Sequence, residues 1–303
     1  MNTERIKNIM IVLLSGLALV LMVLVVADGR QYVLSDDRIV NITEILSQNQ
    51  IGLGENIQIP QNFRPMRQME LSRYNHDILD VAQRFFGNPH FSVNFEGNNQ
   101  TFSNPLSQNT MTYFVREGEI VFEMNDGFFI GVEEEDFART AIAAEITARA
   151  FIDEILGEAA TNMTLSSNRF TATGHYLLTF FDSYAGHLLY DSRIIIRVAE
   201  RGIASVSYFQ AAHNSFIGYA HPIFAADEAF MALLNHLHHT EGIFGPIEIN
   251  NIQVVYIIDP RGNQNRAVPA YFFSITSLQQ QIRFDVVFNA FTNIPIVGMQ
   301  IVH

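Results

Sequence analysis

The sequence predicts an α+β protein in which an N-terminal transmembrane helix is followed by repeated units, each a helix and then an antiparallel meander of strands. Three observations lead to this prediction. Residues 9–27 are apolar and uncharged. Three later segments repeat apolar residues at three- and four-residue steps, as amphipathic helices do. Each of those segments precedes strand-like runs that turn residues connect, which predicts antiparallel sheets covered by helices.

The apolar run at residues 9–27 has Ser15 as its only polar side chain. At about 1.5 Å of rise per residue it is roughly 28 Å long, which fits a hydrocarbon core of about 30 Å. A cleaved signal peptide is the alternative, but its apolar core would be about 7–15 residues and would end in small residues. Arg5 and Lys7 precede the run, which favours a cytoplasmic N-terminus. We therefore predict a cell-membrane protein, single-pass, with an extracytoplasmic C-terminal domain.

The expected elements divide the chain into consecutive segments. These are a cytoplasmic tail at 1–8, the transmembrane helix at 9–27, a membrane-proximal α+β lobe at 28–131, and two repeat units at 132–218 and 219–303. Helices are expected near 39–46 and at 71–86, 135–156 and 226–238. Strands are expected at 91–95, 111–116, 119–125, 171–181, 187–198, 203–211, 247–258, 270–276 and 282–289. Because one face of each sheet must be buried, Tyr208, Phe272 and Phe288 are expected to pack against helices.

The composition limits the classes of function. The chain has 18 Lys and Arg against 31 Asp and Glu, and residues 28–303 alone carry 16 against 30, a net charge of −14. Phosphate binding needs a basic surface, so we predict no nucleic-acid partner. The chain has no cysteine, which suits an exported bacterial protein that is large enough to fold without disulfides.

Several short motifs in the second half of the chain occur in a fixed order. They are Tyr176-Leu-Leu-Thr-Phe-Phe-Asp-Ser-Tyr-Ala-Gly-His-Leu-Leu-Tyr190, Ile194-Ile-Ile-Arg-Val198, Gly202-Ile-Ala-Ser-Val-Ser-Tyr208, Pro222-Ile-Phe-Ala-Ala-Asp-Glu-Ala229, Val268-Pro-Ala-Tyr271 and Phe288-Asn-Ala-Phe-Thr292. This order resembles the PepSY-like units of the YycI and YycH proteins, and YycI most closely. Asn293 and Ile294 depart from the usual Gly-Glu, and Ala225 stands where a Ser or Thr helix cap is common. The chain thus resembles a divergent member of this family.

The resemblance implies a function through protein contact. YycI and YycH proteins are single-pass extracytoplasmic accessory regulators of the WalK (YycG) sensor histidine kinase, which controls cell-wall metabolism in low-GC Gram-positive bacteria. For this chain it implies a kinase of that kind and a YycH-like protein as partners, with no cofactor, no metal and no catalytic residue. It leaves open whether the kinase is activated or restrained, and whether a ligand or peptide binds.

The predicted membrane helix contains three small residues, Ser15, Gly16 and Ala18. Small residues allow membrane helices to approach each other closely, so these three are candidates for contact with a kinase helix. Ordinary membrane-helix composition is the alternative explanation, since no pair among them has the small-xxx-small spacing.

An exported enzyme, such as an anchored cell-wall hydrolase, is the alternative function. Its strongest candidate site is a metal-like cluster of His236, His238, His239 and Glu241. His236 and His239 are three residues apart, a spacing that zinc ligands use on a helix. However, the helix dipole also favours histidines in a last turn, and neither an H-E-x-x-H motif nor a G-x-S-x-G elbow occurs. We therefore predict neither a metal site nor catalysis.

Overall fold

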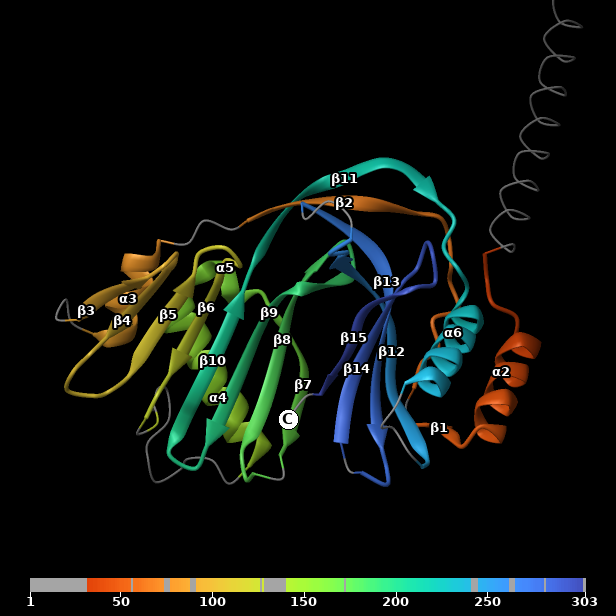
Figure 1. Cartoon of the computed structure of the whole chain (residues 1–303), viewed down its shortest axis with the longest axis horizontal. Coiled ribbons are helices and arrows are strands. Elements are labelled where there is room, and N and C mark those ends of the chain that lie inside the picture. The colour runs from red at the N-terminus through yellow and green to blue at the C-terminus, as the bar shows by residue number, and fades with distance from the viewer. Residues whose placement is uncertain are drawn as a thin grey trace, which may run out of the picture. The chain divides into compact units, whose positions relative to one another are not determined.

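Figure 1 shows a computed structural model of the chain. It describes residues 32–55, 57–73, 77–87, 91–125, 127, 140–171, 173–240, 245–261, 265–280 and 282–301. The predicted membrane helix at 9–27, with Ser15, Gly16 and Ala18, lies outside these residues. No helix within them is long and apolar enough to cross a membrane. The predicted single-pass localisation is corrected accordingly, because the described part of the chain contains no helix that supports it.

The predicted series of helix-plus-meander repeats is wrong. The described strands instead form one mixed hydrogen-bonded network of 15 strands, in which segments far apart in the sequence are neighbours. For example, β6 (Glu119–Glu123) pairs with β10 (Gly202–Phe209), although the two belong to different predicted repeats. A separate meander leaves an edge strand with unpaired N–H and C=O groups on each side. Pairing β6 with β10 satisfies two such edges at once, which explains why the repeats merge.

The chain divides into two compact units, each assembled from segments that are distant in the sequence. Unit 1 comprises residues 1–66, 219–253 and 271–302, and unit 2 comprises residues 67–218, 254–270 and 303. Strands β12 (Ile247–Ile258) and β13 (Arg266–Ser277) contribute residues to both units. We describe each unit by itself.

Unit 2 is built around an eight-stranded antiparallel sheet. Its strand order is β3-β4-β5-β6-β10-β9-β8-β7. Its other elements are β2 (Met66–Arg73), α3 (Ile78–Phe86), β3 (Ser92–Glu96), β4 (Asn99–Ser103), β5 (Thr110–Phe114), α4 (Ala141–Phe151), the π-helical turn η2 (Ile152–Leu156), α5 (Glu158–Thr161), β7 (Thr164–Phe170), β8 (Tyr176–Tyr184), β9 (His187–Ala199) and β11 (Ala211–His221). The first residue of β2 and the last three of β11 belong to unit 1.

Alternation along these strands gives the sheet one apolar face. Because neighbouring residues point to opposite sides, the register aligns apolar residues in rows across the strands. One row is Phe102, Met111, Phe122, Val206, Ile196 and Leu178, and the next is Tyr113, Ile120, Tyr208, Ile194 and Phe180. Helices α3 and α4 lie on this side of the sheet (Figure 1), and their Phe85 and Phe151 join the same buried cluster. The core of unit 2 is therefore one layer of helices on one sheet face.

The helix predicted at 71–86 is shorter in the structure. Met69 and Leu71 are buried while Glu70 and Ser72 are exposed, so the first part follows the two-residue period of a strand and becomes β2. The helix α3 begins after Asp77, whose side chain accepts a hydrogen bond from the N–H of Asp80 at 3.2 Å.

The helix predicted at 135–156 also begins later, at residue 141. Thr140 caps it by accepting a hydrogen bond from the N–H of Ala143 at 3.2 Å. Residues 128–139, which include part of the predicted helix, are outside the described residues. The helical stretch ends at Gly157, whose φ of +82° is a conformation that residues with a side chain rarely adopt.

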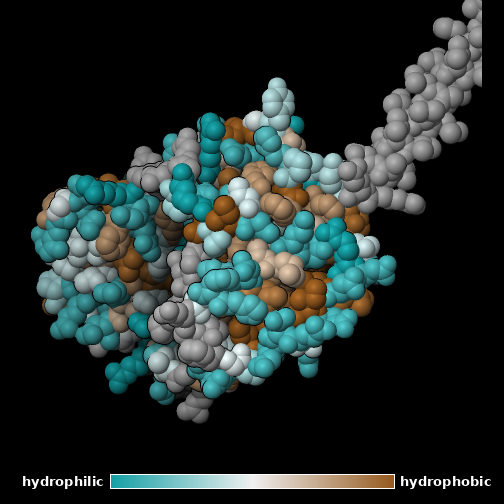
Figure 2. Space-filling view, turned by 45° about the vertical axis from the view of Figure 1, so that its right-hand side comes forward, coloured by the Kyte–Doolittle hydropathy of each residue, from teal (hydrophilic) through white to brown (hydrophobic). Residues whose placement is uncertain are grey.

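Unit 1 packs helices on a second set of strands. Its elements are α2 (Asp36–Gln48), β1 (Ile51–Leu53), α6 (Ala226–His239), β14 (Ile282–Asn289), β15 (Pro295–Ile301) and the unit 1 parts of β12 and β13. Phe230 on α6 lies edge-on to Phe273, which in turn contacts Phe288, with ring centroids 5.4 and 6.0 Å apart. Tyr208, Phe272 and Phe288 are all buried. The predicted packing against helices is confirmed for Phe288, which lies edge-on to His236 of α6, and for Tyr208, which shares a buried cluster with α3 and α4. Phe272 points to the opposite face of β13 from Phe273, which contacts α6, so its packing on a helix stays a prediction. Figure 2 brings this side of the molecule forward and shows hydrophobic surface among hydrophilic side chains.

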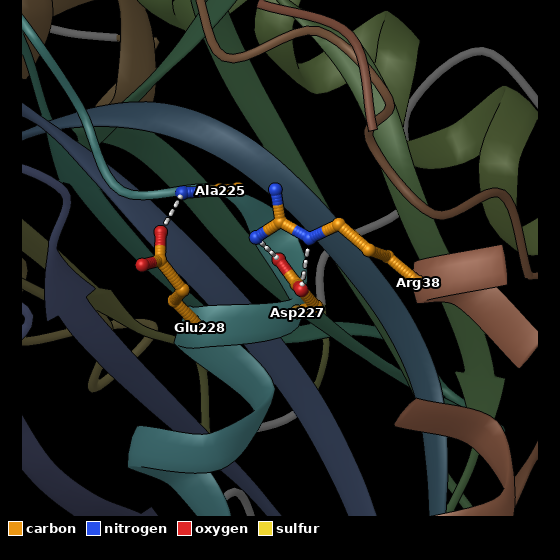
Figure 3. Close-up of polar contacts among 4 residues, drawn as sticks. All are labelled: Arg38, Ala225, Asp227 and Glu228. Atoms are coloured by element: carbon orange, nitrogen blue, oxygen red, sulfur yellow. Dashed lines mark hydrogen bonds and ion pairs between the residues drawn. The ribbon is translucent and has the colours of Figure 1, made fainter. Parts of the chain in front are cut away.

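The N-terminus of α6 is held by two carboxylates (Figure 3). Asp227 accepts from Nε and Nη2 of Arg38 on α2 at 2.6 and 2.7 Å, which joins the two helices through a bidentate ion pair. Glu228 accepts from the backbone N–H of Ala225 at 2.8 Å. The alanine at the cap position has no side-chain oxygen, so Glu228 supplies one half of a capping box. Both acids also lie at the positive end of the helix dipole.

We predict that the Arg38–Asp227 pair stabilises unit 1 measurably. In a double-mutant cycle of Arg38→Ala and Asp227→Ala, the coupling energy should be about 1 kcal/mol, because the pair is bidentate and Asp227 is mostly buried. The measurement is urea unfolding of the four proteins. The exposed Arg149–Glu145 pair within α4 is the control, and its coupling should be about 0.3–0.5 kcal/mol. Equal coupling in the two cycles would contradict the prediction.

Candidate functional site

The three histidines near the end of α6 do not converge. His236 places its ring edge-on to Phe288 at 5.8 Å, and its Nε2 is buried without a hydrogen-bond partner among the described residues. His239 instead contacts the carbonyl of Asn235 through Nδ1 at 2.7 Å, and His238 is exposed. Glu241 lies outside the described residues. Burial lowers the pKa of His236, so this side chain belongs to the apolar packing of unit 1.

The described residues hold no group of three or more His, Asp or Glu side chains that could bind a metal ion. The sequence also predicts no cofactor and no catalytic residue, and those expectations stay predictions. A surface suited to binding a protein lies on the second face of the sheet in unit 2.

We call this second face the open face, because no described helix of unit 2 lies on it. Its central row is Asn94, Thr101, Thr112, Val121, Ser207, Ile195, Thr179 and Ser167. All of these except the exposed Asn94 are half-buried, as expected for side chains that stand on an uncovered sheet. Hydroxyl groups link adjacent strands across it, with Oγ atoms of Ser92 and Ser103 2.8 Å apart and Oγ1 atoms of Thr101 and Thr112 3.3 Å apart. The open face is thus polar and ordered by its own hydrogen bonds.

Charges of opposite sign lie in separate zones of the open face. Arg193 and Arg197 stand on β9, whereas Glu119 and Glu123 stand on β6. The register places Ser205 of β10 between Glu123 and Arg197, and Phe209 between Glu119 and Arg193. Two strand spacings separate the backbone of each acid from that of its arginine by about 10 Å. A complementary partner would carry acidic groups over β9 and basic groups over β6.

A bulge in β9 borders the arginine zone. Phe181 pairs with Arg193 and the next residue, Asp182, pairs with Leu189, so β9 carries three extra residues, Tyr190–Ser192. Bulges of this kind redirect side chains and interrupt pairing, and they are common beside functional sites. The Tyr190 ring packs on Phe181 and lies under the Arg193 guanidinium, 4.9 Å from its centroid. This cation–π contact orients Arg193 on the open face.

Asp191, the middle residue of the bulge, accepts a hydrogen bond from the N–H of Ile258 at 2.5 Å. Near this point β12 pairs with β9 in parallel, at Leu188 and Leu189. The Asp191 carboxylate therefore accepts the hydrogen bond that a backbone carbonyl would accept if the short pairing of β9 with β12 continued. Burial raises the pKa of Asp191 from 3.8 to about 6, and the Ile258 N–H and Arg193 oppose this rise. Asp191 is the carboxyl group most perturbed by its surroundings among the described residues whose pKa shift is resolved.

Aromatic and histidine rings gather next to the bulge. The centroid of the Tyr184 ring lies 4.1 Å from that of His213 and 5.2 Å from that of Phe216. The Tyr256 ring contacts the rings of Phe216 and His187. The Tyr256 hydroxyl donates to the carbonyl of Arg67 at 3.0 Å, and burial raises its pKa to about 12. Tyr256 is therefore a neutral hydrogen-bond donor that fixes the cluster.

Sequence reasoning did not single out Asp191 or the charge zones. The available signal is the run Asp191-Ser192-Arg193, which interrupts an otherwise apolar stretch between Leu188 and Ile196. The opposed charges carry no such signal, because they depend on the pairing of β6 with β10, whose paired residues are 82 to 90 positions apart.

Comparison with solved structures shows a likeness of fold. A crystal structure of an uncharacterized protein from Eubacterium rectale ATCC 33656 gives a TM-score of 0.51 at 12% identity, over 83% of this chain and 92% of that one. At this identity the likeness concerns the fold alone. The C-terminal domain of Bacillus megaterium YpeB gives a TM-score of 0.40 at 11% identity, over 76% and 99% of the two chains. At this TM-score the second likeness carries no argument.

No protein-family model and no curated protein matches the chain. The resemblance to the YycI and YycH proteins therefore stays a prediction from the motifs.

We predict that Asp191→Asn removes a pH dependence of stability. The raised pKa means that, between about pH 4 and 6, the folded protein holds a proton that the unfolded chain has lost. The wild type should therefore gain stability relative to the variant as the pH falls from about 7 to 4, by at most about 3 kcal/mol. Asparagine keeps an acceptor for the Ile258 N–H without the buried charge. Urea unfolding of both proteins at several pH values measures this, and parallel pH curves would refute it.

Proposed function

We propose that this chain is an accessory protein that modulates a two-component sensor histidine kinase by protein contact, without catalysis of its own. The observation that carries the proposal is the open face, with its separate arginine and glutamate zones. A flat surface of this kind offers many weak polar contacts and a fixed charge pattern, which suits recognition of another protein.

The kinase is proposed from the sequence motifs. The motifs at 176–190, 194–198 and 202–208 fall on β8, β9 and β10, which lie between the two edges of the eight-stranded sheet. The arginine zone and the bulge both lie on β9, and Arg197 belongs to the motif at 194–198. The motifs and the candidate contact surface therefore share strand β9, while the glutamate zone on β6 lies outside the motifs. We accordingly propose a kinase of the WalK type, and a YycH-like protein as a second partner.

The acidic character of the chain favours a protein partner over a nucleic acid. Its formal net charge is −13, and the open face itself carries Glu119 and Glu123 beside its arginines. Phosphate groups would be repelled from the glutamate zone. The alternative function, a cell-wall hydrolase, has no observation in its favour among the described residues and is not proposed.

We predict that Arg197→Glu abolishes most of the regulatory effect. The substitution reverses one charge in the arginine zone, so binding to the purified sensor region of the kinase should weaken about tenfold, corresponding to about 1.4 kcal/mol. Expression of the kinase's target genes should shift toward the level found when the whole protein is deleted. Binding is measured by calorimetry and expression by a reporter at equal protein levels.

Arg149→Glu is the matched control, since it makes the same charge change on α4, on the covered side of the same sheet. It should leave binding and target-gene expression unchanged. If the two variants behave alike, the open face is not the contact surface. If deletion of the whole protein leaves kinase output unchanged, the regulatory function itself is wrong.

A further inference from the structure

The strand β3 at one end of the eight-stranded sheet is exposed along its whole length. All five residues, Ser92–Glu96, are exposed, and no described strand pairs with its outer edge. Val93 and Phe95 stand on the apolar face of the sheet, in the same rows as the buried Phe102 and Ile120. Yet they are 39% and 67% exposed. The apolar face therefore continues beyond the part that is buried in the core.

The backbone of β3 is arranged to accept another strand. Glu96 and Asn99 close a two-residue hairpin around Gly97, whose φ is +63°. Hydrogen-bonded and non-hydrogen-bonded pairs alternate from that closing pair in an antiparallel ladder. The pairs Val93–Phe102 and Phe95–Gln100 are thus the non-hydrogen-bonded ones. The N–H and C=O groups of Val93 and Phe95 therefore point away from β4. A new strand would find four backbone groups there, together with two exposed apolar side chains.

The charge around β3 defines the chemistry of an incoming strand. Glu96 is the one charged residue of β3, and residues 91–125 as a whole carry four acids, Glu96, Glu117, Glu119 and Glu123, against the single base Arg116, a net charge of −3. Glu119 and Glu123 lie on β6, three strands away, so Glu96 is the charge that an incoming strand would meet directly. A second copy would bring another Glu96 and the same net negative charge, which opposes self-pairing. A segment with basic side chains is attracted instead.

We propose that β3 binds an extended partner segment by strand addition, and that the segment alternates apolar with basic residues. Its apolar side chains would pack beside Val93 and Phe95, and its basic side chains would lie on the opposite face with Glu96. Main-chain hydrogen bonds supply affinity in this mode, and the alternate side chains supply specificity. The incoming strand would join the edge of the sheet at β3, away from the arginine zone on β9, and the proposal holds whether or not the partner is a kinase.

A labelled heptapeptide of alternating lysine and valine tests the proposal with the full chain. Fluorescence anisotropy should show saturable binding that weakens as salt screens the charges. Phe95→Ala should weaken binding about tenfold or more. Phe170→Ala is the matched control, because Phe170 is equally exposed, at 64%, on the strand β7 at the other end of the sheet. This control should leave peptide affinity unchanged.

Backbone methylation of the peptide provides a test that leaves the protein unaltered. Methyl groups on the nitrogens of one edge of the peptide should abolish binding, whereas methyl groups on the other edge should not, since only one edge pairs with β3. Equal binding by both methylated forms, or by a scrambled peptide of the same composition, would overturn strand addition. Tight binding by a glutamate–valine peptide, or self-association of the protein that Phe95→Ala removes, would overturn the basic partner.

Discussion

The pairing of β6 with β10 is the interaction on which unit 2 depends. It joins β3–β6 to β7–β10, so that two sets of four strands share one apolar face and one helical cover. Phe122 and Ile120 on β6 lie beside Val206 and Tyr208 on β10, which makes the core continuous across the join. The same pairing sets Glu119 and Glu123 at a fixed spacing from Arg193 and Arg197. One backbone ladder thus determines both the core and the charge pattern of the open face.

Unit 1 depends on a more local arrangement. Its helix α6 packs Phe230 on the strands, and its first turn is held by Arg38 and by the carboxylate of Glu228. The missing Ser or Thr at position 225 is therefore compensated from within the helix. Tyr271 adds to this region, because its hydroxyl donates to the carbonyl of Phe224, while burial and the nearby Glu228 and Asp227 raise its pKa. Ala225, where the motifs of YycI and YycH commonly have Ser or Thr, is thus accompanied by a change of capping group.

Local patterns in the sequence predicted several elements well. The strands at 247–258 and 282–289 match β12 and β14, and the helix at 226–238 matches α6 to one residue, because apolar periodicity is strong in all three. The helix predicted at 71–86 is wrong at residues 71–73, where the two-residue alternation that includes Met69 and Leu71 forms the end of β2. The topology could not be predicted, since the partners of β6 and β12 are set by long-range pairing. Asp191 was missed for the same reason: its environment depends on β12.

The β6–β10 ladder also has a consequence for how the chain folds. Its residues Phe122 and Val206 are 84 positions apart, so the two halves of the sheet can each form from local hairpins well before they meet. Closing such a long loop is slow compared with hairpin formation. During that interval β6 and β10 are open edges that other chains could join. Glu119 and Glu123 place charge on the β6 edge, whereas β10 contains no charged residue. Before the two edges meet, β10 is therefore the one that is more exposed to pairing with another chain.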